Sequence, residues 1–111
     1  MLNVSLNSLN LKKLNRKEIY EINKLKNSFW KYGLKNNLIW FKKNVLKDDI
    51  HVILKFKKKI IGYNLLRKRN FYYNSKKKNY YYFDTLIIDK KYRRLNLAKK
   101  ILKFNNEIFK E

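Results

Sequence analysis

The sequence predicts a layered α+β domain in which two helices come first, an antiparallel meander of three strands follows and a helix ends the chain. Apolar residues recur at helical spacing between residues 15 and 48, and the spacing changes to every second residue from Ile50 onward. Residues 83–102 have the pattern of a strand, a short basic turn and a helix. The 111 residues suffice for one domain with a modest core and are too few for two.

Two helices are predicted in the first half of the chain. Asn15 should cap the first helix, and the Glu18 side chain should reach back to the backbone N–H of the cap. Gly33 separates this helix from a second one, which should end near Asp48. The apolar residues at helical spacing are Ile19, Ile22, Leu25 and Phe29 in the first helix and Leu34, Leu38, Phe41 and Val45 in the second. Before both, residues 9–14 alternate weakly and are expected to form an edge strand.

The aromatic residues of this region and the single histidine are interpreted as structural. Trp30, Tyr32 and Trp40 lie at helical spacing, which is more typical of a core than of a base-stacking surface, the alternative. His51 lies in a predicted strand and should face solvent or pair strands, with no part in catalysis.

Three strands are predicted after the helices. Ile50 begins the first, with apolar residues at every second position up to Phe56. The turn at residues 57–59 consists of three lysines and contains no glycine or aspartate, so it should be longer than two residues or strained. Residues 60–69 form the second strand, with Gly62 at a bulge or a close approach of backbones. Residues 70–79 are expected to be a loop, and 80–89 the third strand.

The third strand leads into a turn and a helix that together suit an anion. Leu86, Ile87 and Ile88 are typical of a buried strand, and apolar residues recur at helical spacing from Leu97 onward. A helix that begins just after a strand points unpaired N–H groups and the positive end of its dipole into the intervening loop. Four basic residues add attraction there: Lys90, Lys91, Arg93 and Arg94.

Residues 93–98, which read Arg-Arg-Leu-Asn-Leu-Ala, resemble the signature of the GCN5-related N-acetyltransferases (GNAT). The signature is an arginine or glutamine, two variable residues, glycine, one variable residue, then glycine or alanine. The family pattern is met by Arg93 and Ala98. It is also met by Tyr92, which precedes the arginine, and by the apolar strand that ends in Asp89. Asn96 replaces the central glycine; asparagine tolerates a left-handed backbone, although its side chain should crowd a pyrophosphate.

The resemblance implies a GNAT-like fold that lacks the family's C-terminal elements, so residues 1–111 are expected to be a single, partial N-acetyltransferase domain. It implies transfer of an acetyl group from acetyl-coenzyme A, as co-substrate, to a small-molecule or protein amine that is not identified. The backbone amides of Leu86, Ile87 and Ile88 would hold the pantetheine. The loop amides that would hold the pyrophosphate are those of Arg93, Arg94, Leu95, Asn96, Leu97 and Ala98.

The resemblance also implies a catalytic base on the third strand. Asp84 is the best candidate, with an ion pair to a lysine as the equally weighted alternative. Asp89 is second, because its place at the end of the strand suits a cap better. A strand around Leu86 that remains an open edge invites pairing with a second copy of the chain, so a homodimer is possible.

Composition excludes several classes of function. No cysteine is present, so disulfides and cysteine-based zinc sites are excluded, and no metal site is predicted. No serine lies in a nucleophile-elbow context, which leaves covalent hydrolase chemistry without support. No segment has the apolar length of a membrane span or a signal core, so a cytoplasmic protein without membrane contact is expected.

The net charge of +21 suggests polyanionic partners. The charge is mostly lysine and is spread along a chain that is also rich in asparagine, isoleucine and tyrosine, so a genome rich in AT codons explains it sufficiently. Non-specific polyanion binding is still expected. Two alternatives therefore accompany the acetyltransferase: a basic nucleic-acid-binding module with aromatic stacking residues, and a catalytically incomplete acyltransferase fragment.

Overall fold

In the computed structural model, which describes residues 3–109, two helices, a three-strand meander and a last helix follow in the predicted order, and a strand precedes them. Short 3-10 turns lie at Leu11–Lys13 and Lys90–Tyr92. The elements are β1 (Val4–Leu9), α1 (Arg16–Phe29), α2 (Leu34–Asn44), β2 (Ile50–Phe56), β3 (Lys59–Tyr73), β4 (Lys76–Ile88) and α3 (Leu97–Phe109).

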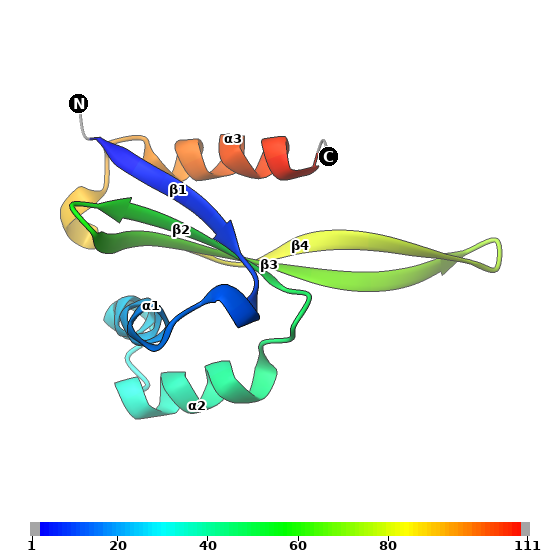
Figure 1. The fold of residues 1–111 in the computed structure, drawn as a ribbon, viewed down its shortest axis with the longest axis horizontal. Coiled ribbons are helices and arrows are strands. Elements are labelled where there is room, and N and C mark those ends of the chain that lie inside the picture. Colours follow the sequence, from blue (N-terminus) through cyan, green and yellow to red (C-terminus); the bar gives the residue numbers. More distant parts are fainter. Residues whose placement is uncertain (1–2, 110–111) are drawn as a thin grey trace.

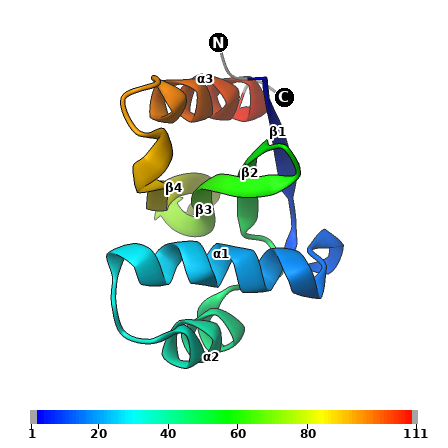
Figure 2. The ribbon, with the colours of Figure 1, turned by 90° about the vertical axis from the view of Figure 1, so that its left-hand side faces the viewer.

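The four strands form one antiparallel sheet in the order β1-β2-β3-β4, which lies between two helical layers. α1 and α2 cover one face and α3 covers the other (Figures 1 and 2). Each face has its own apolar cluster, one around Ile22, Tyr63 and Ile87 and the other around Leu66 and Ile101. The far half of β3 and β4 extends beyond the helices as a hairpin (Figure 1). Within residues 3–109, no helix is long and apolar enough to cross a bilayer.

The first helix begins as predicted, whereas the first strand lies earlier in the chain than expected. The Glu18 N–H donates to Asn15 Oδ1 at 2.7 Å, and the Asn15 N–H donates to Glu18 Oε1 at 3.0 Å, so the capping box is confirmed. The strand expected at residues 9–14 is wrong, because Asn10 Oδ1 accepts the Lys13 N–H and caps a 3-10 turn there. α2 ends before the predicted Asp48, since Val45 takes extended backbone.

Both hairpin connections are tight turns with left-handed residues. Lys57 and Lys58 have φ of 50° and 67°, so the strained alternative of the predicted turn is correct. The loop expected at residues 70–79 is wrong: β3 and β4 continue through it to a two-residue turn at Asn74 and Ser75. Tyrosine and phenylalanine favour strands, and here they outweigh the lysine and asparagine that suggested a loop.

Gly62 lies where backbones approach closely, as predicted. A Cβ there would lie 3.0 Å from Ile88 Cδ1 and 3.1 Å from Leu54 Cβ. The register of β2 and β3 shifts beside it, between Leu54 and Lys55. The missing side chain therefore lets β2, β3 and β4 pack at this point.

His51 lies inside the core, so the solvent-facing alternative is wrong, although it does pair with Leu9 and Leu65 across the sheet. Its Nδ1 lies 2.6 Å from the Tyr63 hydroxyl, its ring stacks on Tyr63, and the Phe41 ring lies tilted beside it at 5.5 Å between centroids. Burial lowers the pKa of His51 to about 4. The imidazole is therefore neutral at pH 7, and its tautomer decides whether Nδ1 or the Tyr63 O–H donates this hydrogen bond.

Acid should destabilise the fold through this histidine. The unfolded chain binds a proton on His51 below about pH 6.5, whereas the folded chain binds it only below a pKa of about 4. The unfolded state therefore binds more protons between these values, and the free energy of unfolding should fall by about 2 kcal/mol between pH 7 and pH 5. Urea unfolding at both pH values measures this fall. His51→Leu with Tyr63→Phe removes both hydrogen-bonding partners and should abolish it; an equal fall in the double variant would contradict the assignment.

Candidate active site

The turn after β4 has the backbone geometry predicted for an anion-binding loop. Asn96 takes a left-handed conformation with φ of 58°, as expected for an asparagine in place of the motif glycine, and Arg94 does so with φ of 69°. The Asn96 carbonyl accepts the Lys100 N–H at 3.2 Å and so opens α3. The first N–H groups of an α-helix have no partner within the helix, so those of α3 lie at this turn.

The side chains of Arg93 and Asp89 accept or donate hydrogen bonds that fix this turn to the end of β4. Arg93 Nε donates to the Ile88 carbonyl at 3.3 Å, and its guanidinium lies 4.3 Å from the centroid of the Phe29 ring. The Arg93 side chain thus ties the loop to β4 and α1. Asp89 accepts the Lys91 N–H at 3.0 Å and lies near Lys59 Nζ, so its predicted capping role is confirmed.

The end of β4 offers free backbone groups at its outer edge. The Asp89 N–H donates to the Ile61 carbonyl at 2.7 Å. Because inward and outward pairs alternate in an antiparallel ladder, the backbone groups of Ile87 face β3 and those of Leu86 and Ile88 face outward. Leu86 is also half-exposed, whereas Ile87 is buried. Pantetheine binding by these residues stays a prediction, and the geometry favours Leu86 and Ile88 as its donors.

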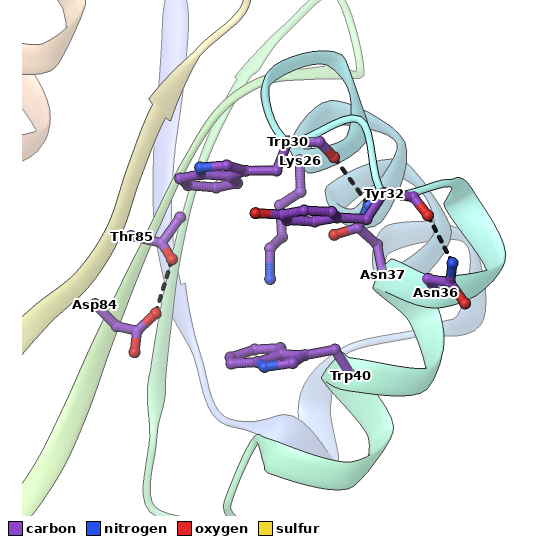
Figure 3. A pocket seen from close by; sticks show the side chains of 8 residues that line it. All are labelled: Lys26, Trp30, Tyr32, Asn36, Asn37, Trp40, Asp84 and Thr85. Carbon is purple, nitrogen blue, oxygen red and sulfur yellow. Dashed lines mark hydrogen bonds between the residues drawn. The ribbon is translucent and has the colours of Figure 1, made fainter.

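Asp84 occupies a bulge in β4. Leu65 pairs with Thr85 and Leu66 pairs with Phe83, so Asp84 has no backbone pairing partner in the β3–β4 ladder. Thr85 Oγ1 donates to Asp84 Oδ1 at 2.9 Å. A bulge re-aims the side chain that it carries. Here it turns the carboxylate toward α1 and α2 (Figure 3).

A buried chain of amides holds the bulge from the α3 side of the sheet. Asn105 Nδ2 of α3 donates to Asn64 Oδ1 at 2.6 Å, and Asn64 Nδ2 donates to the Thr85 carbonyl at 2.7 Å. Both asparagines are fully buried. The displaced carbonyl of the bulge is thereby satisfied, which a buried backbone group requires.

On the opposite face, Arg67 joins two aspartates. Its guanidinium lies 3.3 Å from Asp49 Oδ2 and 3.6 Å from Asp84 Oδ2. Asp49 is fully buried in the α2–β2 connection and also accepts the Leu46 N–H at 2.9 Å. The ion pair predicted for Asp84 is therefore with an arginine and not with a lysine, while its role as a base stays a prediction.

Asp84 forms part of a pocket with aromatic walls. The cavity measures about 430 Å³ and lies between α1, α2 and β4. Trp30 and Tyr32 lie on one side of it and Trp40 on the other (Figure 3). They are 40%, 69% and 37% exposed, so the core interpretation of these residues is wrong. The reason is that Trp30 ends α1 and Tyr32 lies in the following turn, beyond the helical face that packs on the sheet.

Lys26 projects into the same pocket. Its Nζ lies 4.2 Å from the centroid of the Trp40 ring, between the two aromatic walls (Figure 3). Burial lowers the pKa of Lys26, and the Asp84 carboxylate opposes part of that effect. A cation over an indole face is favourable, which explains how a buried lysine is tolerated.

Sequence reasoning missed Lys26, Asn64, Arg67 and Asn105. Two of them carried a signal. Arg67 follows Leu65 by two residues on the buried face of a strand, and Lys26 follows Ile22 by four on the buried face of a helix. A charged residue in register with a buried face needs a partner, and these partners form the site.

The fold and the turn before α3 place the chain among known proteins. A model of the acetyltransferase (GNAT) family matches residues 16–110. The chain belongs to this family. GNAT enzymes use an acyl-coenzyme A donor, so the chain is a GNAT acetyltransferase, and the acceptor is not identified by the match. A comparison with curated protein sequences gives no match.

Solved GNAT structures share the fold at low sequence identity. An aminoglycoside N-acetyltransferase, AAC(6')-Iy in complex with CoA, superposes with a TM-score of 0.73 at 12% identity, over 99% of this chain and 71% of that one. A possible acetyltransferase from Clostridium difficile 630 gives 0.72 at 11%, over 97% and 71%. A GNAT family acetyltransferase from Staphylococcus aureus gives 0.68 at 20%, over 97% and 78%. The predicted GNAT-like fold is therefore confirmed.

Arg67 should matter chiefly as the partner of Asp49. Arg67→Met leaves a fully buried carboxylate without its nearest cation, and should lower the free energy of unfolding by about 3 kcal/mol. Asp49→Asn added to Arg67→Met should recover much of that loss, because no unpaired charge then remains. Urea unfolding of the wild type, both single variants and the double variant measures the coupling. Additive losses would show that the two residues act independently.

Proposed function

We propose that this chain transfers an acetyl group from acetyl-coenzyme A to an amine that enters the aromatic pocket. The position of Asp84 carries the proposal. Its carboxylate lines the pocket, and it lies two residues before Leu86, whose backbone groups face the outer edge of β4. Asp84 therefore lies both at a pocket that can hold the acceptor and near a strand edge that can hold the thioester. We treat the chain as a single domain.

The residues present fit the coenzyme. The proposed pyrophosphate cradle comprises the backbone N–H groups of the loop and of the first turn of α3, with Arg94 and Asn96 left-handed within it. Its members are Arg93, Arg94, Leu95, Asn96, Leu97 and Ala98. Leu86 and Ile88 present outward backbone groups toward which a pantetheine amide can hydrogen-bond. Ile87, which faces β3, contributes packing through its buried side chain.

The thioester supplies an activated acyl group when it is bound, and the protein has to orient the amine and remove its proton. Asp84 accepts that proton directly or through a water. Arg67 Nη1 lies 3.6 Å from Asp84 Oδ2 and holds the carboxylate in place at the pocket. An outward N–H of β4 stabilises the negative charge that develops on the thioester oxygen.

The aromatic walls support an acceptor with an amine beside an apolar or flat group. Trp30, Tyr32 and Trp40 enclose a volume that suits a small molecule or one side chain of a protein. Lys26 already places one cation against Trp40, so an acceptor ammonium fits best on the Asp84 side of the cavity.

Removing the Asn96 side chain should strengthen coenzyme binding. Asn96→Gly keeps the left-handed backbone at no steric cost and lets phosphates come closer, which should improve affinity for acetyl-coenzyme A by about 1 kcal/mol. Isothermal titration at moderate salt measures this. Arg93→Ala should weaken binding only modestly, because the Arg93 side chain braces the loop while backbone groups hold the anion. No change in Asn96→Gly together with loss of binding in Arg93→Ala would indicate generic charge attraction. Absence of saturable binding in the wild type would remove the proposal.

Asp84→Asn should slow transfer without weakening coenzyme binding. The amide keeps the shape of the side chain and cannot accept the proton, so turnover should fall by about 10²-fold. The readout is release of the coenzyme A thiol from acetyl-coenzyme A in the presence of a panel of primary amines. Asp48→Asn is the matched control, since Asp48 is exposed and lies outside the pocket. Equal turnover of Asp84→Asn and Asp48→Asn would contradict a role for Asp84 as base.

A further inference from the structure

We propose that one face of the β3–β4 hairpin binds single-stranded nucleic acid. The hairpin arm, residues 67–82, begins beside α2 and α3 and extends beyond the helices toward its tip (Figure 1). It carries six lysine and arginine residues and no aspartate or glutamate. The AT-rich codons that explain the net charge of the chain do not explain this arm. Its 16 of 111 residues hold six of the chain's 18 phenylalanine, tyrosine and tryptophan residues.

The register of the hairpin sorts these residues by face. Partners that lie directly opposite each other in an antiparallel pair point to the same side, and so does every second pair along the ribbon. On the side that includes Arg67, each of the four pairs joins one cation to one aromatic ring. Arg67 itself is buried in its ion pairs with Asp49 and Asp84, so the cations that face a ligand are those of the other three pairs. The pairs of this face, called the cation–aromatic face below, are Arg67 with Tyr82, Arg69 with Tyr80, Phe71 with Lys78, and Tyr73 with Lys76.

The opposite face of the arm is interrupted. Asn70 pairs with Asn79 in its middle. Tyr81 stacks on Phe109 of α3 with ring centroids 5.8 Å apart, and so is partly covered. Lys68 and Lys77 give this face charge, and each pairs with a ring, Tyr81 and the exposed Tyr72. The Asn70–Asn79 pair separates these two rings, so this face has no continuous row of rings.

Three rings of the cation–aromatic face lie next to one another, and the Arg69 guanidinium lies against one of them. Phe71 and Tyr80 lie 5.7 Å apart, Tyr80 and Tyr82 lie 6.4 Å apart, and the Arg69 guanidinium lies 5.3 Å from the Tyr82 ring. The exposed fractions are 36% for Tyr82, 44% for Tyr80, 45% for Phe71 and 64% for Tyr73. Exposure thus rises toward the tip, and ring surface is available along the whole row.

Such a row fits a partner that alternates negative charge with flat rings. A single strand of nucleic acid provides phosphates and unstacked bases in that alternation, and its bases stack on aromatic side chains without regard to sequence. An acidic peptide would satisfy the cations but not the rings, and a duplex keeps its bases stacked inside. The observations therefore favour a single strand, bound independently of acetyl-coenzyme A.

Two charge-matched variants test the proposal. Lys76→Gln with Lys78→Gln removes two charges from the cation–aromatic face, and Lys68→Gln with Lys77→Gln removes two from the opposite face of the same arm. Binding of a fluorescein-labelled 15-nucleotide RNA, and of DNA of the same sequence, is followed by anisotropy between 50 and 300 mM salt. The first variant should weaken binding about tenfold at 150 mM salt and reduce the slope of log affinity against log salt by about 1.4. The second should have little effect.

Tyr80→Thr provides a readout that charge cannot explain. It keeps the net charge and a strand-forming residue, and the loss of one stacking platform should weaken binding about tenfold with the salt slope unchanged. Circular dichroism confirms that each variant is folded. Equal losses in the two lysine variants, an unchanged affinity in Tyr80→Thr, or equal competition by polyglutamate would overturn the proposal. A difference in affinity between the RNA and the DNA shows whether the arm prefers ribose or deoxyribose.

Discussion

The site depends on one ion-paired arginine at a bulge. Arg67 holds Asp84 of the bulge and Asp49 of the α2–β2 connection together, and its guanidinium also donates to the Asn44 carbonyl at the end of α2. Without this cation the carboxylates of Asp49 and Asp84 would repel each other, and the end of α2 would lose its hydrogen bond to β3. The aromatic pocket lies between α1, α2 and β4, and of the residues that Arg67 contacts, Asp84 lines it.

The same bulge is fixed from the opposite face by neutral groups. The Asn105 and Asn64 amides extend from α3 to the Thr85 carbonyl and replace the ladder hydrogen bond that the bulge removes. Each layer of helices is thus linked to the same point of β4, by charge on one side and by amides on the other. Because α3 also presents its N-terminus to the loop at Asn96, the proposed base and the proposed phosphate cradle are connected through one short helix.

Part of the fold and of the site could be predicted from interactions between residues that are close in the sequence. The Asn15–Glu18 capping box and the left-handed Asn96 depend on residues a few positions apart, and both are confirmed. The bulge at Asp84 depends on how β3 and β4 register, and that is set by Asn64, Arg67 and Asn105, which lie far away in the sequence. The exposure of Trp30 and Trp40 is missed for the same reason. Helical spacing indicates which residues share a face, but not that β4 is the edge strand and that Asp84 and Thr85 line a cavity with these rings.

The outer edge of β4 cannot serve two of the proposed partners at once. Pairing with a second copy of the chain would use the outward N–H and C=O groups of Leu86 and Ile88, and the proposed pantetheine site uses the same groups. The Ile88 carbonyl already accepts a hydrogen bond from Arg93 Nε, so strand pairing is less favourable at this end of β4. We infer that strand pairing between copies and coenzyme binding exclude each other along Leu86–Ile88, so any dimer compatible with acetyl transfer must use another surface.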